Sequence, residues 1–140
     1  MNIQLVSTKA IRINLDPLDI DLDDTSELES FAFDFNPMFP EEKDESNSFA
    51  IVFNGEMKNC KENYIIKVVF LSVFEVDELI TVDFLKDNFA LINAPAISYP
   101  YFRAFYSNFL LTSGYEPFIL PTINFVQLRK DKLEAINSRS

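Results

Sequence analysis

The sequence predicts an α+β fold: a four-stranded antiparallel sheet, followed by C-terminal helices that pack on one face of it. Three observations support this prediction. The 140 residues suit one domain, spanning 1–140. Four segments in the first half alternate apolar and polar residues, which is typical of strands with one buried face. After residue 83 the apolar spacing changes to three and four, which indicates helices.

The first two predicted strands are Lys9–Leu15 and Ser30–Phe35. In the first, alternate positions are apolar and are expected to share a face: Ile11, Ile13 and Leu15. In the second, the alternate positions are all phenylalanine: Phe31, Phe33 and Phe35. β-branched and aromatic residues at a period of two favour a pleated, half-buried strand.

The third and fourth predicted strands are Ser48–Asn54 and Tyr64–Val76, and the alternation can be followed onward through Leu79–Val82. Asn54 and Gly55 begin the segment between the two strands, which ends at Asn63. Because Asn and Gly tolerate positive φ, we expect this segment to be a hairpin loop. Consecutive strands with short connections favour an antiparallel sheet.

Two helices are predicted in the last third of the chain. The first begins near Asn93, with this or a nearby residue as cap and Pro95 in the first turn, and ends at Gly114. Its apolar positions follow helical spacing: Tyr99, Phe102, Phe105, Tyr106, Phe109 and Leu110. A proline-containing segment then leads to a second helix that begins near Asn124.

The composition argues against a conventional enzyme and against a bound cofactor. Histidine is absent, which excludes Ser-His-Asp and Cys-His relays. The two glycines, Gly55 and Gly114, lie too far apart for a phosphate-binding loop. The single cysteine, Cys60, cannot form an internal disulfide and has no histidine to activate it.

The acidic segment Asp19–Asp23 resembles the opening of a calcium-binding loop. Such a loop needs Gly at its sixth position and Glu at its twelfth. Asp24 and Ser30 occupy those places here. We therefore expect a solvated acidic segment rather than a metal site.

The net charge of −10 excludes further classes of partner. Proteins that bind nucleic acids or anionic membranes need a basic surface, so neither partner is expected. No secretory signal is visible at the start, and the apolar run Ile65–Phe74 is much shorter than the roughly 20 residues of a membrane-spanning helix. The sequence therefore predicts a soluble cytoplasmic protein with no direct membrane insertion.

The aromatic content is the most informative feature of the composition, with 15 phenylalanines and five tyrosines. A stripe of phenylalanines on a strand is usually core. Here, however, the aromatic residues exceed what such a small sheet and two helices would ordinarily bury, so the surplus belongs either to an oligomer interface or to a binding groove. A groove lined by aromatic rings and edged with acid would bind extended, apolar and often basic polypeptide.

The C-terminal third resembles the protein-export chaperone family SecB. The match is specific over about residues 92–126 and less specific elsewhere, where Thr8-Lys9 and the order of four strands agree with the family pattern. The motifs that match in order and spacing are Tyr99-Pro100-Tyr101-Phe102-Arg103, Gly114-Tyr115, Leu120-Pro121 and Asn124-Phe125.

This resemblance implies a homotetramer, assembled as a dimer of dimers, that binds unfolded precursors in long hydrophobic grooves without ATP. It also implies transfer of the precursors to the SecA ATPase of the translocon. The family contacts SecA through acidic residues, and the corresponding positions here are Ala10, Asn14 and Val73. None of them is acidic, so the resemblance does not extend to these contacts.

On this basis we expect an ATP-independent holdase. Its expected client-binding residues are Phe31, Phe33, Phe35, Ile51, Phe53, Phe118, Ile119, Leu120, Phe125 and Leu128. Its expected subunit contacts are Ile11, Ile13, Tyr106 and Phe109. Two alternatives stay open: a SecB-like chaperone devoted to one partner such as an antitoxin, and a small-ligand carrier, which predicts a closed pocket and a monomer.

Overall fold

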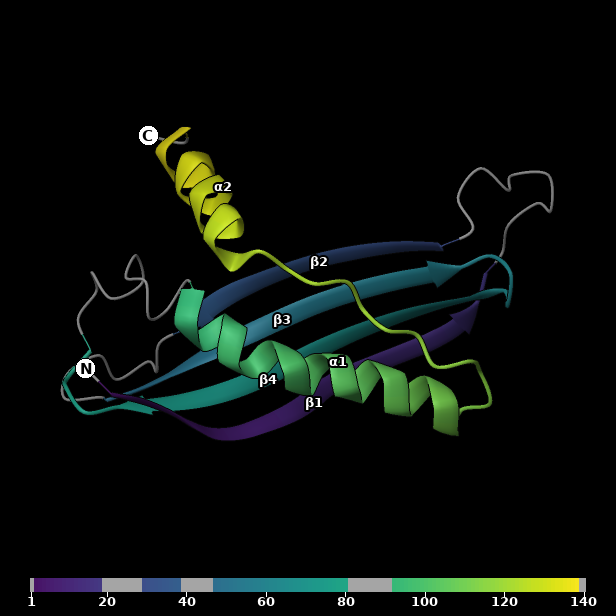
Figure 1. Ribbon diagram of the computed structural model, residues 1–140, viewed down its shortest axis with the longest axis horizontal. Coiled ribbons are helices and arrows are strands. Elements are labelled where there is room, and N and C mark those ends of the chain that lie inside the picture. Colours follow the sequence, from purple (N-terminus) through teal and green to yellow (C-terminus); the bar gives the residue numbers. More distant parts are fainter. Residues whose placement is uncertain (1, 19–28, 39–46, 81–91, 139–140) are drawn as a thin grey trace.

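The computed structural model describes residues 2–18, 29–38, 47–80 and 92–138 (Figure 1). The described part contains four strands and two helices in the predicted order, strands first and helices last. Their bounds are β1 Ile3–Pro17, β2 Glu29–Met38, β3 Ser48–Asn59, β4 Tyr64–Val76, α1 Ala94–Thr112 and α2 Phe125–Ser138.

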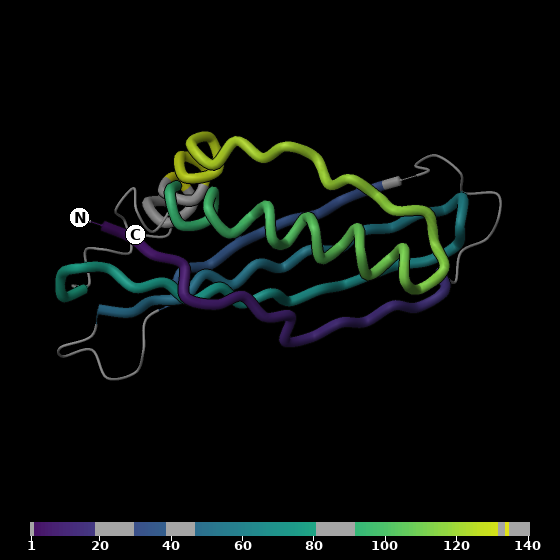
Figure 2. The backbone as a smooth tube through the Cα atoms, turned by 60° about the horizontal axis from the view of Figure 1, so that its bottom comes forward, coloured from purple at the N-terminus to yellow at the C-terminus, as the bar shows by residue number. Residues whose placement is uncertain are grey.

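The strands form one antiparallel sheet in the order β1-β4-β3-β2, so β1 and β2 are its edges. Both helices and the segment that joins them lie on the same side of this sheet (Figure 2). The predicted fold class is therefore confirmed.

The predicted hairpin loop between the third and fourth strands is wrong at its beginning. β3 continues through Asn59, and Gly55 pairs with Phe33 on one side and Val68 on the other. The turn occupies residues 60–63, where Asn63 takes the positive φ of 58°. Likewise β4 ends at Val76, so the suggested strand continuation is absent at residues 79–80, and residues 81–82 lie outside the described part.

β1 contains two irregularities that change which of its residues share a face. The register with β4 shifts between Leu5 and Ser7 and again between Ala10 and Arg12. Ile13 is paired with the buried Val68 and so faces the helices, whereas Ile11 lies at the second shift and has no partner in the register with β4. A bulge adds one residue to the strand at this point, so the simple alternation predicted from Ile11 to Ile13 is interrupted.

The core lies between the sheet and α1, which crosses the sheet diagonally (Figure 1). Alternate side chains of the two central strands are buried there, as the period of two requires. The strand residues are Phe49, Ile51, Phe53 and Met57 of β3 and Tyr64, Ile66, Val68, Phe70, Phe74 and Val76 of β4. α1 contributes Tyr99, Phe102, Tyr106 and Leu110.

Gly55 lets α1 approach the sheet closely. A Cβ atom at this position would lie 2.6 Å from Cζ of Phe102 and 2.8 Å from the hydroxyl oxygen of Tyr106. The Tyr106 hydroxyl donates a 2.7 Å hydrogen bond to the Gly55 carbonyl oxygen. Helix and strand therefore meet at a point where only glycine fits.

α1 ends as the sequence predicts, at Gly114. With φ of +97°, Gly114 adopts a conformation that other residues rarely take. Its N–H donates to the Leu111 carbonyl at 3.2 Å, and the Tyr115 N–H donates to the Leu110 carbonyl at 2.9 Å. These two bonds form a Schellman motif.

The two helix beginnings differ. Asn93 occupies the predicted cap position of α1, but its side chain makes no cap hydrogen bond. Asn124 does cap α2, because its Oδ1 accepts a 3.1 Å hydrogen bond from the Gln127 N–H. Among the described residues, neither helix is long and apolar enough to cross a membrane.

Candidate polypeptide-binding groove

A groove lies between the edge strand β2 and the beginning of α2. Its volume is about 390 Å³. One wall consists of half-buried rings of β2, and the other of the segment before α2 and the first turn of that helix. The lining residues are Phe31, Phe33, Pro121, Thr122, Ile123, Asn124, Gln127 and Leu128.

Phe33 joins the groove to the core. Its ring centroid lies 5.2 Å from that of Phe53, 5.5 Å from that of Tyr99 and 5.8 Å from that of Phe102. The ring is half-buried, so part of it remains at the groove surface. Because its neighbours hold it on several sides, Phe33 offers a preorganised aromatic surface to a ligand.

A hydrogen bond from α1 fixes the opposite wall. The Tyr99 hydroxyl donates to the Pro121 carbonyl oxygen at 2.5 Å. Burial raises the pKa of Tyr99 to about 12, although the charge of Arg103 opposes this effect. Tyr99 therefore stays protonated near neutral pH and holds Pro121 in place.

The α2 side of the groove carries polar groups. The Gln127 side chain donates a 3.2 Å hydrogen bond to Oδ1 of Asp131, and both residues are exposed. Together with the Asn124 cap, this gives the groove an apolar floor and a polar, partly acidic border. Such an arrangement suits binding of apolar side chains that extend from a chain with solvated polar groups.

The structure distributes the ten predicted client-binding residues over three environments. Three line the groove: Phe31, Phe33 and Leu128. Two lie in the connecting segment after α1: Phe118, which is half-buried, and Ile119, which is 75% exposed. The side chains of the other five are buried in the core: Phe35, Ile51, Phe53, Leu120 and Phe125.

The predicted subunit-contact residues also separate. Ile11 and Ile13 lie on the edge strand β1 with 51% and 38% of their surface exposed. Phe109 is half-buried and stacks on Phe105 with ring centroids 5.7 Å apart. Tyr106 is fully buried in the core of its own chain, so its side chain is not at the surface.

Sequence reasoning missed the residues between the proline-containing segment and the second helix, notably Thr122, Ile123 and Gln127. Thr122 and Ile123 directly follow Leu120-Pro121, and Gln127 lies three residues after the cap Asn124. Asn124 was predicted only as a helix beginning. The sequence does predict that the second helix starts directly after this segment. That prediction was the signal that could have placed Thr122, Ile123 and Gln127 together beside the second strand.

The described part of the chain holds no cluster of three or more His, Cys, Asp or Glu side chains that could bind a metal ion. The acidic segment Asp19–Asp23 lies outside the described residues. Cys60 lies in the turn between β3 and β4 and is half-buried.

Comparison with protein families finds a match over most of the chain. Residues 32–135 match the family model described as preprotein translocase subunit SecB. Because this match covers most of the chain, the protein belongs to the SecB family, whose members are chaperones. The resemblance seen in the sequence is thus confirmed.

Two solved structures share the fold. A SecB-like chaperone from Mycobacterium tuberculosis, in complex with a ChAD peptide from the HigA1 antitoxin, matches with a TM-score of 0.64 and 13% identity, over 87% of this chain and 90% of that chain. A protein of unknown function from Streptococcus agalactiae matches with a TM-score of 0.51 and 11% identity, over 87% and 98% of the two chains. Comparison with curated protein sequences finds no match.

Proposed function

We propose that the protein is an ATP-independent holdase that binds non-native polypeptides and keeps them unfolded for export. The half-exposed aromatic groove beside β2, in a chain of the SecB family, carries this proposal. A groove of this size accepts the apolar side chains of a short extended segment, while the rest of the client remains in solution. The net charge of −10 favours clients with basic residues next to the apolar ones.

Suppression of client aggregation in the absence of nucleotide tests the proposal. Leu128 lines the groove, and Leu128→Asp places a carboxylate on its apolar wall, which an apolar client side chain would have to desolvate. We expect light scattering to show that the variant needs several-fold more protein for half-maximal suppression. Ile123→Asp, at another position of the same groove, should act in the same direction.

Val126→Asp is the matched control because Val126 lies on the same helix, is 63% exposed and does not line the groove. It should suppress aggregation as well as the unchanged protein. Circular dichroism establishes that all three variants are folded. Equal loss in the control, or no suppression by the unchanged protein at stoichiometric ratio, contradicts a client site in this groove.

A second candidate function is chaperoning of one dedicated partner such as an antitoxin. The SecB-like chaperone from Mycobacterium tuberculosis shares this fold and was solved with an antitoxin peptide, and this supports the second candidate function. Affinity capture separates the two functions. Recovery of a single partner, with no effect on unrelated unfolded clients, would favour the dedicated chaperone.

Transfer of clients to SecA and assembly into a homotetramer remain parts of the proposal. The three positions compared with SecA-contacting residues separate in the structure. Asn14 and Val73 pair with Lys67 and Ser7 on the sheet face away from the helices, whereas Ala10 pairs with the buried Phe70. For subunit contacts, the exposed Ile11 and Ile13 on the β1 edge are the candidates that the structure leaves at the surface.

A further inference from the structure

The sheet has a second face, turned away from α1, which we call the outer face. In the described part of the chain no helix covers it, because both helices lie on the opposite side (Figure 2). Antiparallel sheets commonly leave one face to solvent, and the side chains of such a face are then mainly polar. The outer face of this sheet departs from that pattern, because its centre is apolar.

The apolar residues form two adjacent columns on the central strands, which we call the apolar strip. β4 contributes Val69, Leu71 and Val73, and β3 contributes Val52 and Ala50. All five side chains are half-buried. Leu71 pairs with Val52 and Val73 pairs with Ala50, so the two columns lie side by side. A continuous apolar area on a charged surface is typical of an interaction site.

Charged side chains of opposite sign border the apolar strip. On the β1 side, Lys9 pairs with Leu71 and Arg12 pairs with Val69. On the β2 side, Asp34 pairs with Asn54, which is the β3 partner of Val69. Lys9, Arg12 and Asp34 are exposed. The strip therefore has a basic border on β1 and an acidic border on β2.

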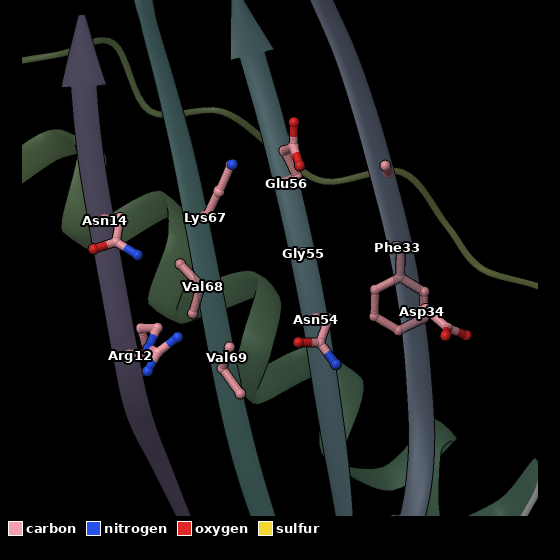
Figure 3. A pocket seen from close by; sticks show the side chains of 11 residues that line it. Arg12, Asn14, Phe33, Asp34, Asn54, Gly55, Glu56, Lys67, Val68 and Val69 are labelled. Carbon is pink, nitrogen blue, oxygen red and sulfur yellow. The ribbon is translucent and has the colours of Figure 1, made fainter.

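A hollow at one end of the strip repeats this division. Its volume is about 530 Å³, and Arg12, Asp34, Glu56 and Lys67 are among the residues that line it (Figure 3). Lys67 lies on β4, next to β1, whereas Glu56 lies on β3, next to β2. The division ends in the next row, where Asp16 and Lys58 flank Ile65 with the signs reversed.

We propose that the outer face binds an amphipathic helix of another protein. The apolar stripe of this helix would lie on the apolar strip. Acidic residues along one flank of the stripe would face Lys9 and Arg12, and basic residues along the other flank would face Asp34. This site lies on the opposite side of the sheet from the client groove, so the inference goes beyond the proposed function.

The dimensions of the strip suit a helix. An α-helix with its side chains is about 10 Å wide, and neighbouring strands are about 4.8 Å apart. A helix above β3 and β4 therefore covers both columns and brings its flanks over β1 and β2. From Lys67 to Val73 the rows extend over roughly 20 Å, which is the length of about 13 helical residues.

An extended segment fits the strip less well than a helix. It would cover the width of about one strand, and a strand gains its affinity from unpaired backbone groups at a sheet edge. β3 and β4 are central strands, and each is paired on both sides. The partner must therefore be bound through side chains. Because the two borders have opposite charges, they also fix the direction in which the helix lies.

Three fluorescently labelled model peptides of about four helical turns test this site by fluorescence anisotropy. All three share one leucine stripe. The mixed peptide carries Glu on one flank and Lys on the other, the lysine peptide carries Lys on both, and the glutamate peptide carries Glu on both. The unchanged protein should bind the mixed peptide several-fold more tightly than either of the others. The net charge of −10 alone would favour the lysine peptide.

The double variant Lys9→Glu/Arg12→Glu makes both borders of the strip acidic, so it should bind the lysine peptide more tightly than the mixed peptide. Lys61→Glu/Lys130→Glu is the matched control, because it changes the net charge equally at two exposed positions in the β3–β4 turn and on α2. This control should keep the preference for the mixed peptide. Leu128→Asp, in the client groove, should keep it as well.

Four results would contradict the site. The unchanged protein could bind none of the peptides, or bind the lysine peptide most tightly. The double variant could keep the preference for the mixed peptide although circular dichroism shows that it is folded. Loss of mixed-peptide binding in Leu128→Asp would place the peptide in the client groove instead. The double variant should still suppress client aggregation, so failure of this proposal is distinguishable from failure of the holdase.

Discussion

At the scale of single residues, Gly55 sets the distance between the helix layer and the sheet. Gly55→Ala would place a methyl group within 3 Å of the Phe102 ring and the Tyr106 hydroxyl, both of which are fully buried. The rings cannot move without disturbing the core, so we expect the free energy of unfolding to fall by about 2–3 kcal/mol in urea titrations. Asn54→Ala, at the exposed neighbouring position, should change it by less than about 0.5 kcal/mol. Equal stability of the two variants would contradict this role.

Two buried tyrosines make the fold sensitive to alkaline pH. Burial raises the pKa of Tyr99 to about 12, and burial together with the charge of Glu56 raises the pKa of Tyr106 further. In the unfolded chain both ionise near their ordinary value of 10.0. The unfolded state therefore loses protons first, and the stability present below pH 10 is lost as the pH rises toward 12.

Urea unfolding between pH 9 and 11.5 measures this loss, which approaches about 1.4 kcal/mol per pH unit for each tyrosine above pH 10. Tyr106→Phe should flatten the slope and, because it also removes the hydrogen bond to Gly55, lower stability near neutral pH by about 1 kcal/mol. Tyr101→Phe, at a largely exposed side chain, should keep the slope. A slope that Tyr106→Phe does not change would refute the contribution of Tyr106.

The role of Gly55 shows where sequence reasoning ends at this scale. Asn54-Gly55 is typical of a hairpin turn, and local preference alone therefore predicts a loop. The reason for glycine at this position lies on α1, about fifty residues later in the chain. Contacts over such a separation have no local signal in one sequence.

At the scale of secondary-structure elements, the Schellman motif ends α1. Gly114 has φ of +97°, but no atom lies within 4 Å of the position that a Cβ would take. Gly114→Ala should therefore lower stability by about 1–2 kcal/mol, through backbone strain alone. D-alanine at the same position, introduced by semisynthesis, favours positive φ and should preserve the urea midpoint. A destabilising D-alanine would show that contacts rather than backbone conformation decide the effect.

The elements also show which boundaries a sequence can predict. Regular alternation identified all four strands, and Gly114 gave the end of α1. The beginning of β1, from Ile3 to Thr8, was missed because the extra residue near Val6 interrupts the period of two. A second bulge, near Ile11, interrupts the period inside the predicted part of the strand. The alternation of apolar and polar residues therefore fails as a predictor where the hydrogen-bond ladder between two strands is irregular.

At the scale of the whole molecule, the aromatic residues are less exposed than the composition suggests. The sequence has more aromatic rings than an ordinary core of this size would hold. Many of these rings are nevertheless buried between α1 and the sheet, and Phe35 and Phe53 are among them. A strand pattern shows that two faces differ, but it does not show which helix covers which part of a face. Half of the predicted client-binding residues therefore lie in the core.

The two edges of the sheet carry separate surfaces with distinct proposed partners. The groove lies beside β2, and the exposed isoleucines lie on the β1 edge. Because β1 and β2 are opposite edges of the sheet, a client and a neighbouring subunit would not compete for the same residues.

The sheet order has a consequence for synthesis on the ribosome. β2, β3 and β4 follow one another and can pair as they emerge, but among the described strands β1 pairs only with β4, which is translated roughly sixty residues later. Because translation proceeds at about 5–20 residues per second, the backbone N–H and C=O groups of β1 stay unpaired for several seconds. The two bulges, together with Lys9 and Arg12, make β1 a poor template for another strand. The chain thus carries protection for its own first strand.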